Sequence, residues 1–135
     1  MASFTKIHSF VENLAEKKID LSGAELTIAL TNTAHTAAWD ELADLTEVAY
    51  TNCSSRVITV STSSQTTGTY KLVCADLTLT ASGAVGPFQY VYIYDDGSTG
   101  DKLICYYDYG SAVTLADGDT FKVDFDGTDG VLTIA

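Results

Sequence analysis

Apolar and polar residues alternate over most of this chain, a pattern that is typical of β-strands with one buried face. The clearest example is Thr120 to Asp126, where Phe121, Val123 and Phe125 are predicted to point inward and the residues between them outward. The other predicted strands are Glu25 to Thr31, Arg56 to Ser61, Thr69 to Ala81, Phe88 to Asp95, Lys102 to Tyr109 and Val131 to Ala135, with a further short strand or turn at Ser111 to Leu115.

The N-terminal segment has a different period, because its apolar residues recur every three or four positions. Phe4, Ile7, Phe10, Val11 and Leu14 would lie on one stripe of a helix, so the pattern predicts an α-helix from Ser3 to about Lys18. Such a helix either covers one end of a sheet or forms an arm that packs on a neighbouring molecule.

Turn residues separate the predicted strands. They stand at Asp96-Gly97, Asp117-Gly118, Asp126-Gly127 and Asp129-Gly130. Trp39 to Val48 has the pattern of a short helix, and Thr62 to Gly68 that of a polar connection. Short strands at this spacing are typical of an antiparallel sandwich. We therefore predict one all-β domain over residues 1–135, with an N-terminal α-helix or arm at residues 1–20 and an antiparallel, jelly-roll-like β-sandwich at residues 24–135.

The strand predicted from Phe88 to Asp95 is apolar on both faces. Val91 and Ile93 fall on one side, and the other side carries an aromatic stripe made of Phe88, Tyr90, Tyr92 and Tyr94. An aromatic stripe of this size requires something to pack against. Two partners are compatible with the pattern, a second layer of the same chain or another subunit.

Charge limits the possible partners. The chain has 18 acidic and 7 basic residues, a net charge of −11, and no cluster of basic residues. Nucleic acid and anionic membranes are poor partners for such a protein, since binding to phosphate requires local positive charge. The excess of acid instead favours solubility and attraction to a basic surface.

The three cysteines, Cys53, Cys74 and Cys105, are odd in number and show no CxxC spacing, so they predict neither a disulfide framework nor a zinc site. Cys74 and Cys105 stand in apolar runs, where a free thiol behaves as a small hydrophobic group. The start of the chain, MASFTKIHSF, lacks the apolar core of a signal peptide. Together these features predict a protein that matures in a reducing compartment.

Residues with catalytic or metal-binding chemistry are sparse. The acidic run at Asp124 to Gly130 would need a glutamate at position 135 to form an EF-hand loop, and that position is alanine. The two histidines, His8 and His35, stand alone, and no nucleophile elbow or phosphate loop is present. Asp76 and Asp108 interrupt apolar strands and are predicted to be structural acids. We predict a protein without catalytic residues, cofactor or metal.

Parts of the sequence also resemble a known protein family. The segments GPFQYVYIYDD and YDYGSAVTLADGDTFKVDFDGTDGVLTIA, with most of the chain from Phe4 to Ala135, resemble a family of small virion proteins of tailed bacteriophages. The resemblance implies a capsid decoration, or cement, protein that binds the outer surface of the phage head and stabilises it. Its implied partners are further copies of itself and the major capsid protein. A tail, neck or fibre-attachment component is the alternative, and a carbohydrate-binding module is a second one.

The aromatic residues are the predicted contact surface for those partners, because rigid aromatic side chains supply contact area at a low entropic cost. The residues predicted to form the interface are Phe4, Ile7, Phe10, Phe88, Tyr90, Tyr92, Tyr94, Tyr106, Tyr107 and Tyr109.

Overall fold

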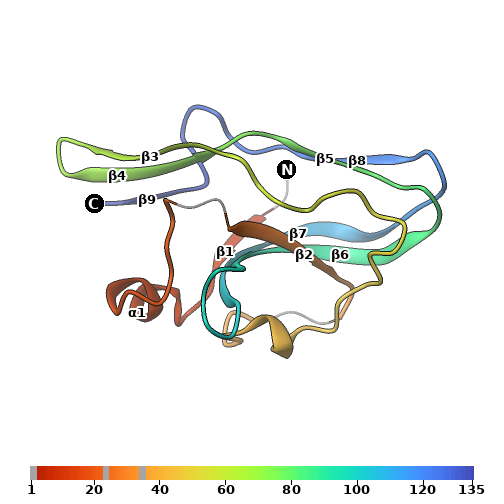
Figure 1. Ribbon diagram of the computed structural model, residues 1–135, viewed down its shortest axis with the longest axis horizontal. Helices are drawn as coiled ribbons and strands as arrows, with labels where there is room; N and C mark the ends of the chain where they lie inside the picture. The colour runs from red at the N-terminus through yellow and green to blue at the C-terminus, as the bar shows by residue number, and fades with distance from the viewer. Residues whose placement is uncertain (1–2, 23–24, 34–35) are drawn as a thin grey trace.

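A computed structural model describes residues 3–22, 25–33 and 36–135 of the chain as an all-β, sandwich-like protein. The main sheet has four strands in the order β1-β7-β6-β2, and all neighbouring pairs are antiparallel (Figure 1). These strands are β1 (Ser3–Lys6), β2 (Leu26–Thr31), β6 (Val85–Asp95) and β7 (Lys102–Leu115). The predicted antiparallel all-β fold is confirmed.

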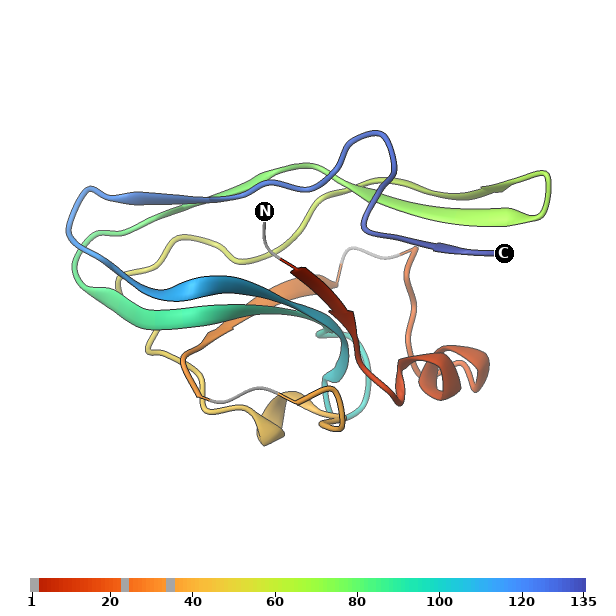
Figure 2. The same ribbon diagram turned by 180° about the vertical axis from the view of Figure 1, so that it is seen from behind.

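Two smaller sheets form a layer above the main sheet (Figures 1 and 2). At one end of this upper layer lie β3 (Val60–Thr66), β4 (Thr69–Cys74) and β9 (Leu132–Ile134), and at the other end lie β5 (Leu77–Thr80) and β8 (Thr120–Val123). The chain runs from β4 into β5 and returns from β8 towards β9, so the two small sheets share one layer. Buried apolar side chains from both layers make up the core.

The underside of the main sheet is covered by the helix α1 (Phe10–Ala15) and by a segment that contains the 3-10 turn η1 (Leu42–Asp44) (Figure 1). Trp39 of this segment lies against Tyr92, with ring centroids 6.3 Å apart. An ion pair fixes the segment, because the Lys102 ammonium donates to Asp40 over 2.6 Å. The underside is therefore closed by the chain itself.

The predicted N-terminal helix is wrong over its first half. Residues Ser3–Lys6 form β1, which pairs with β7, and only Phe10–Ala15 is helical. The three-residue spacing of Phe4 and Ile7 favours a helix, and pairing with an adjacent strand overrides that preference. The helix starts after Ser9, whose hydroxyl donates to Asp40 and accepts no hydrogen bond from the first turn of the helix. None of the described helices has the length and hydropathy of a bilayer span.

Several predicted strand boundaries also change. The run Thr69 to Ala81 divides into β4 and β5, and the two predicted pieces after Lys102 are one strand, β7. The polar connection predicted at Thr62 to Gly68 is mostly strand β3, since an exposed hairpin needs little apolar sequence. Trp39 to Val48 holds only the single turn η1. The inward alternation predicted for Thr120 to Asp126 holds, with Val123 and Phe125 buried and Phe121 half-buried.

The aromatic stripe of β6 is divided between the two faces of the sheet. Register shifts between Val85 and Tyr90 interrupt the pairing of β6 with β7, and an irregularity of this kind changes the face to which the following side chains point. Phe88 thus lies 5.1 Å from Phe121 in the upper layer, whereas Tyr92 lies against Tyr106 and Trp39 on the underside. Both partners of the stripe belong to the same chain.

Candidate interaction surface

The two edges of the main sheet differ in how they are covered. At the β2 edge, the Ile28 amide donates to the Arg56 carbonyl and the Val48 amide donates to the Leu30 carbonyl, over 3.0 Å each. A connecting segment therefore protects this edge. At the other edge, β1 is the terminal strand, and in the described part of the chain it pairs with β7 alone. Unprotected strand edges attract other strands.

The direction of the β1 backbone groups follows from two hydrogen bonds. The Ile7 amide donates to the Ile104 carbonyl of β7 over 3.1 Å, whereas the His8 amide donates outward to the Ala37 carbonyl over 2.8 Å. Because backbone groups alternate in direction along an antiparallel strand, those of Phe4 and Lys6 point away from β7. These two residues thus present their N–H and C=O groups to the open edge.

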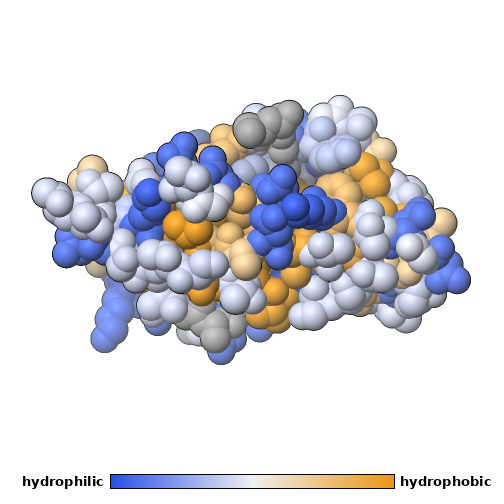
Figure 3. Space-filling view, turned by 90° about the horizontal axis from the view of Figure 1, so that it is seen from above, coloured by the Kyte–Doolittle hydropathy of each residue, from blue (hydrophilic) through white to orange (hydrophobic). Residues whose placement is uncertain are grey.

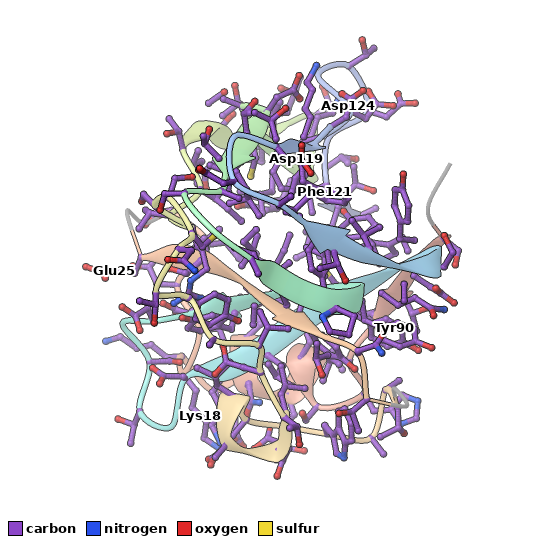
Figure 4. All side chains as sticks on the ribbon, turned by 90° about the vertical axis from the view of Figure 1, so that its right-hand side faces the viewer. Lys18, Glu25, Tyr90, Asp119, Phe121 and Asp124 are labelled. Carbon is purple, nitrogen blue, oxygen red and sulfur yellow. The ribbon has the colours of Figure 1, made fainter. Side chains whose placement is uncertain are left out.

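An aromatic hollow opens between the two layers near this edge, with a volume of about 380 Å³. Tyr107 and Tyr109 of β7 form its floor, and Phe121 and Phe125 form its roof. Tyr109 and Phe121 stand edge to face with centroids 5.3 Å apart. Figure 4 shows Phe121 between the upper layer and the main sheet, with Asp124 above it.

A second hollow, of about 710 Å³, lies between β1, α1 and β9, and we call it the C-terminal hollow. Phe4 and Lys6 line it on one side, and Val11, Leu14 and Ile134 are among its other lining residues. Phe4 also contacts Tyr107 of the aromatic hollow, with centroids 5.6 Å apart. Phe4 therefore stands between the two hollows.

Large apolar side chains remain exposed around both hollows. The exposed fractions are 43% for Phe4, 51% for Val11, 52% for Tyr109 and 39% for Ile134. With Lys6 and Tyr107, these residues constitute what we call the β1 surface. Figure 3, which looks onto the upper layer, shows apolar side chains that reach the surface between hydrophilic ones. Clustered exposed apolar groups mark sites of interaction more often than single ones do.

Charged groups frame the aromatic hollow. The Lys122 ammonium lies 2.9 Å from the Asp76 carboxylate, and this contact lowers the pKa of Asp76 and raises that of Lys122. Asp76 also accepts the Phe125 amide over 3.0 Å, which fixes the roof of the hollow. Burial is the main cause that raises the pKa of Tyr107 above its ordinary value.

The structure places the ten predicted interface residues in two groups. Three are accessible, namely Phe4, Tyr109 and the half-buried Tyr107. The prediction is corrected for the other seven, which the chain buries in its own core: Ile7, Phe10, Phe88, Tyr90, Tyr92, Tyr94 and Tyr106. Sequence reasoning missed Ile134 and Phe121, although alternation in the last strand and in β8 places both on apolar faces.

In the acidic run from Asp124 to Gly130, Asp126 caps a turn. The Asp126 carboxylate accepts the amides of Asp129 and Thr128 over 2.8 Å each, and these bonds lower the pKa of Asp126. Asp108 accepts the Gln89 amide group over 3.0 Å and the Gly110 backbone amide over 2.8 Å. Within residues 3–22, 25–33 and 36–135, no three potential ligands gather as a metal site.

The cysteines and histidines are the remaining candidate side chains. Cys74 and Cys105 are buried as predicted, and Cys53 is half-buried. His8 is exposed, whereas His35 lies outside the described residues.

Comparisons with known protein families, with curated proteins and with solved structures found no match.

Proposed function

We propose that this protein is a structural component of a tailed-bacteriophage virion, and that it decorates the outer surface of the head. The observation that carries the proposal is the β1 surface. Six of the eight tyrosines were predicted to serve protein contacts, yet among the described residues four of the five exposed large apolar side chains, those of Phe4, Val11, Tyr109 and Ile134, belong to the β1 surface beside the open strand edge. That combination is typical of a site that binds protein.

The rest of the molecule suits this role. Two packed layers form a rigid body, and rigid bodies lose little entropy when they dock. The net charge of −11 keeps an abundant protein soluble before assembly and attracts it to a basic shell. Weak contacts on a repetitive shell then add up through multivalency. The proposed partners are the major capsid protein and further copies of this chain.

A binding experiment tests the proposal. Purified protein would be added to phage heads that lack it, and the bound fraction would be measured by sedimentation of the heads. We expect the wild-type protein to bind and Tyr109→Ala to bind at least about fivefold more weakly, since a contact aromatic residue contributes about 1–3 kcal/mol. A wild-type protein that stays in the supernatant contradicts the proposal.

Val57→Ala is the matched control. Val57 is 49% exposed, similar to Tyr109, but it belongs to the segment that covers the opposite edge of the main sheet, where it bridges to Thr27. We expect this variant to bind within about twofold of the wild type, because isolated surface apolar groups contribute little. Equal losses for both variants would mean that the β1 surface is not the contact.

A carbohydrate-binding module is the second candidate, and the aromatic hollow favours it. Sugars stack on exposed aromatic rings, and Tyr109 presents such a ring beside the charged pair of Lys122 and Asp76. A glycan array separates the two functions. Binding of a glycan by the wild type, lost in Tyr109→Ala, supports the module, and an array without signal supports the virion role.

A further inference from the structure

Within the described residues, the outward-facing backbone groups of β1 have no hydrogen-bond partner. The backbone groups of Phe4 and Lys6 point away from β7, as the bonds of Ile7 and His8 establish. We infer that this edge pairs with the β1 strand of a second copy of the chain, antiparallel and about a two-fold axis. The inference rests on the proposed function only for its biological context. It deepens that function by naming one partner, a second copy of the chain, and the strand through which the two copies contact each other.

The register of the pairing follows from the alternation of side chains. A two-fold axis perpendicular to the sheet leaves the upper face of both copies on the same side, so residues of equal parity must stand opposite each other. With Thr5 opposite Thr5 of the second copy, Phe4 stands opposite Lys6 and Lys6 opposite Phe4. Phe4 of each copy then forms two backbone hydrogen bonds with Lys6 of the other copy. The four-stranded main sheet thereby continues into the next molecule.

Side chains on the upper face complement each other in this register. Phe4 and Lys6 both line the C-terminal hollow, so they share one face of β1. Phe4 of the second copy then lies beside Lys6, over the hollow that Val11 and Ile134 border, and its ring comes within reach of the Lys6 ammonium. A projecting ring and a matching hollow on one edge make a self-complementary contact, as a two-fold interface requires.

The exposed area predicts how strong this contact is. A phenylalanine side chain buries about 150–250 Å² when it is covered. The 43% exposure of Phe4 therefore leaves about 90 Å², and Val11 and Ile134 add a similar amount together. Each copy thus offers far less than the roughly 800 Å² of a standard interface. We expect a weak dimer, with a Kd of about 10 µM to 1 mM.

Charge distinguishes a second copy from a basic partner strand. Two chains of net charge −11 repel each other, so added salt should strengthen self-association by screening the repulsion. A basic strand from another protein would bind less tightly in salt. Lys6 also disfavours a basic partner strand, because its ammonium group would then lie near the positive side chains of that strand. A second copy places Phe4 beside it instead.

Sedimentation equilibrium of the purified protein is the first test. We expect the weight-average mass to rise from 14.4 kDa towards twice that value over about 1 µM to 1 mM, and to rise further with salt. Lys6→Pro should raise the Kd at least about tenfold, because proline removes an outward N–H while the bonds to β7 stay. A chain that remains monomeric throughout, or a Lys6→Pro variant that dimerises equally well, overturns the inference.

A cross-linking test reports the register. Thr5 of the two copies would form a non-hydrogen-bonded pair with Cα atoms about 4.5 Å apart, within the range of a disulfide. In a Cys53→Ser background, Thr5→Cys should oxidise to a covalent dimer at least about tenfold faster than Ser64→Cys, which lies exposed on β3, another terminal strand. Equal rates contradict the pairing. Thermal unfolding of each variant confirms that it is folded.

The outcomes separate this inference from the proposed function. A monomer that binds phage heads contradicts β1 pairing and leaves the virion role intact. A dimer that forms the predicted cross-link and does not bind phage heads supports β1 pairing and contradicts the virion role.

Discussion

The ion pair between Asp40 and Lys102 determines whether the underside of the main sheet stays closed. Asp40 accepts hydrogen bonds from the Lys102 ammonium, the Ser9 hydroxyl and the Asn13 amide, over 2.6 Å, 2.6 Å and 2.7 Å. It thus joins β7, α1 and the segment that carries Trp39. We predict that Asp40→Asn destabilises this closure, and that the loss depends on pH.

The magnitude follows from the pKa of Asp40. The bond from Lys102, followed by that from Ser9, lowers this pKa from its ordinary value of 3.8 to about 2. Without solvent screening, this pKa difference corresponds to about 2.5 kcal/mol of folding free energy. The side chain is 38% exposed, so solvent screening reduces the expected contribution to about 1 kcal/mol. For a chain of this length, that lowers Tm by about 4 °C.

The sign of the pH dependence is fixed by the direction of the pKa shift. A carboxylate with a lowered folded-state pKa stabilises the fold above about pH 4, and the stabilisation is lost as pH falls towards 2. Wild type and Asp40→Asn should therefore differ by about 1 kcal/mol at pH 7 and converge near pH 2.

Fluorescence of Trp39 is the assay, since it is the only tryptophan and lies against Tyr92. Urea unfolding would be followed at several pH values for the wild type, Asp40→Asn and the control Asp117→Asn, an exposed acid in the turn after β7. The control should match the wild type at pH 7. A difference between wild type and Asp40→Asn that is absent, or that persists unchanged at pH 2, refutes the reasoning.

Three further predictions concern a core tyrosine, a glycine with positive φ and the cysteines. Tyr92→Ala should lower the unfolding free energy by about 3–5 kcal/mol and Tyr109→Ala by about 1 kcal/mol or less, as measured by urea denaturation, because only Tyr92 is fully buried; similar losses would contradict this. Gly130→Ala should cost at least about 2 kcal/mol more than Gly110→Ala in the same assay, since both have positive φ but only at Gly130 would a Cβ meet backbone, 2.5 Å from a carbonyl oxygen. Mass spectrometry after brief maleimide treatment should show Cys53 labelled about a hundredfold faster than the two buried cysteines, and equal labelling in denaturant is the control.

The sequence predicts most reliably the strands that are buried on one face only. β8 is an example, because Val123 and Phe125 face the core while Lys122 and Asp124 face solvent, and the alternation is plain in the chain. β2 is also found, although it is buried on both faces, since its run of apolar and threonine residues is bounded by polar ones. Pattern alone suffices where burial and period agree.

Features that depend on distant partners were beyond the pattern. The spacing of Phe4 and Ile7 fits a helix, and only the presence of β7 makes this segment a strand. The irregular pairing of β6 near Phe88 divides the aromatic stripe, and no residue in the stripe signals it. The open edge of β1 likewise follows from strand order, so the interface residues could be proposed from sequence but not sorted into core and surface.

Copy number in purified phage particles tests the central claim most directly. Quantitative mass spectrometry would compare this chain with the major capsid protein of the same particles. The account predicts copies on the order of hundreds per particle, as a decorated shell requires. A count of about a dozen or fewer, which suits a ring in the neck or tail, would contradict it.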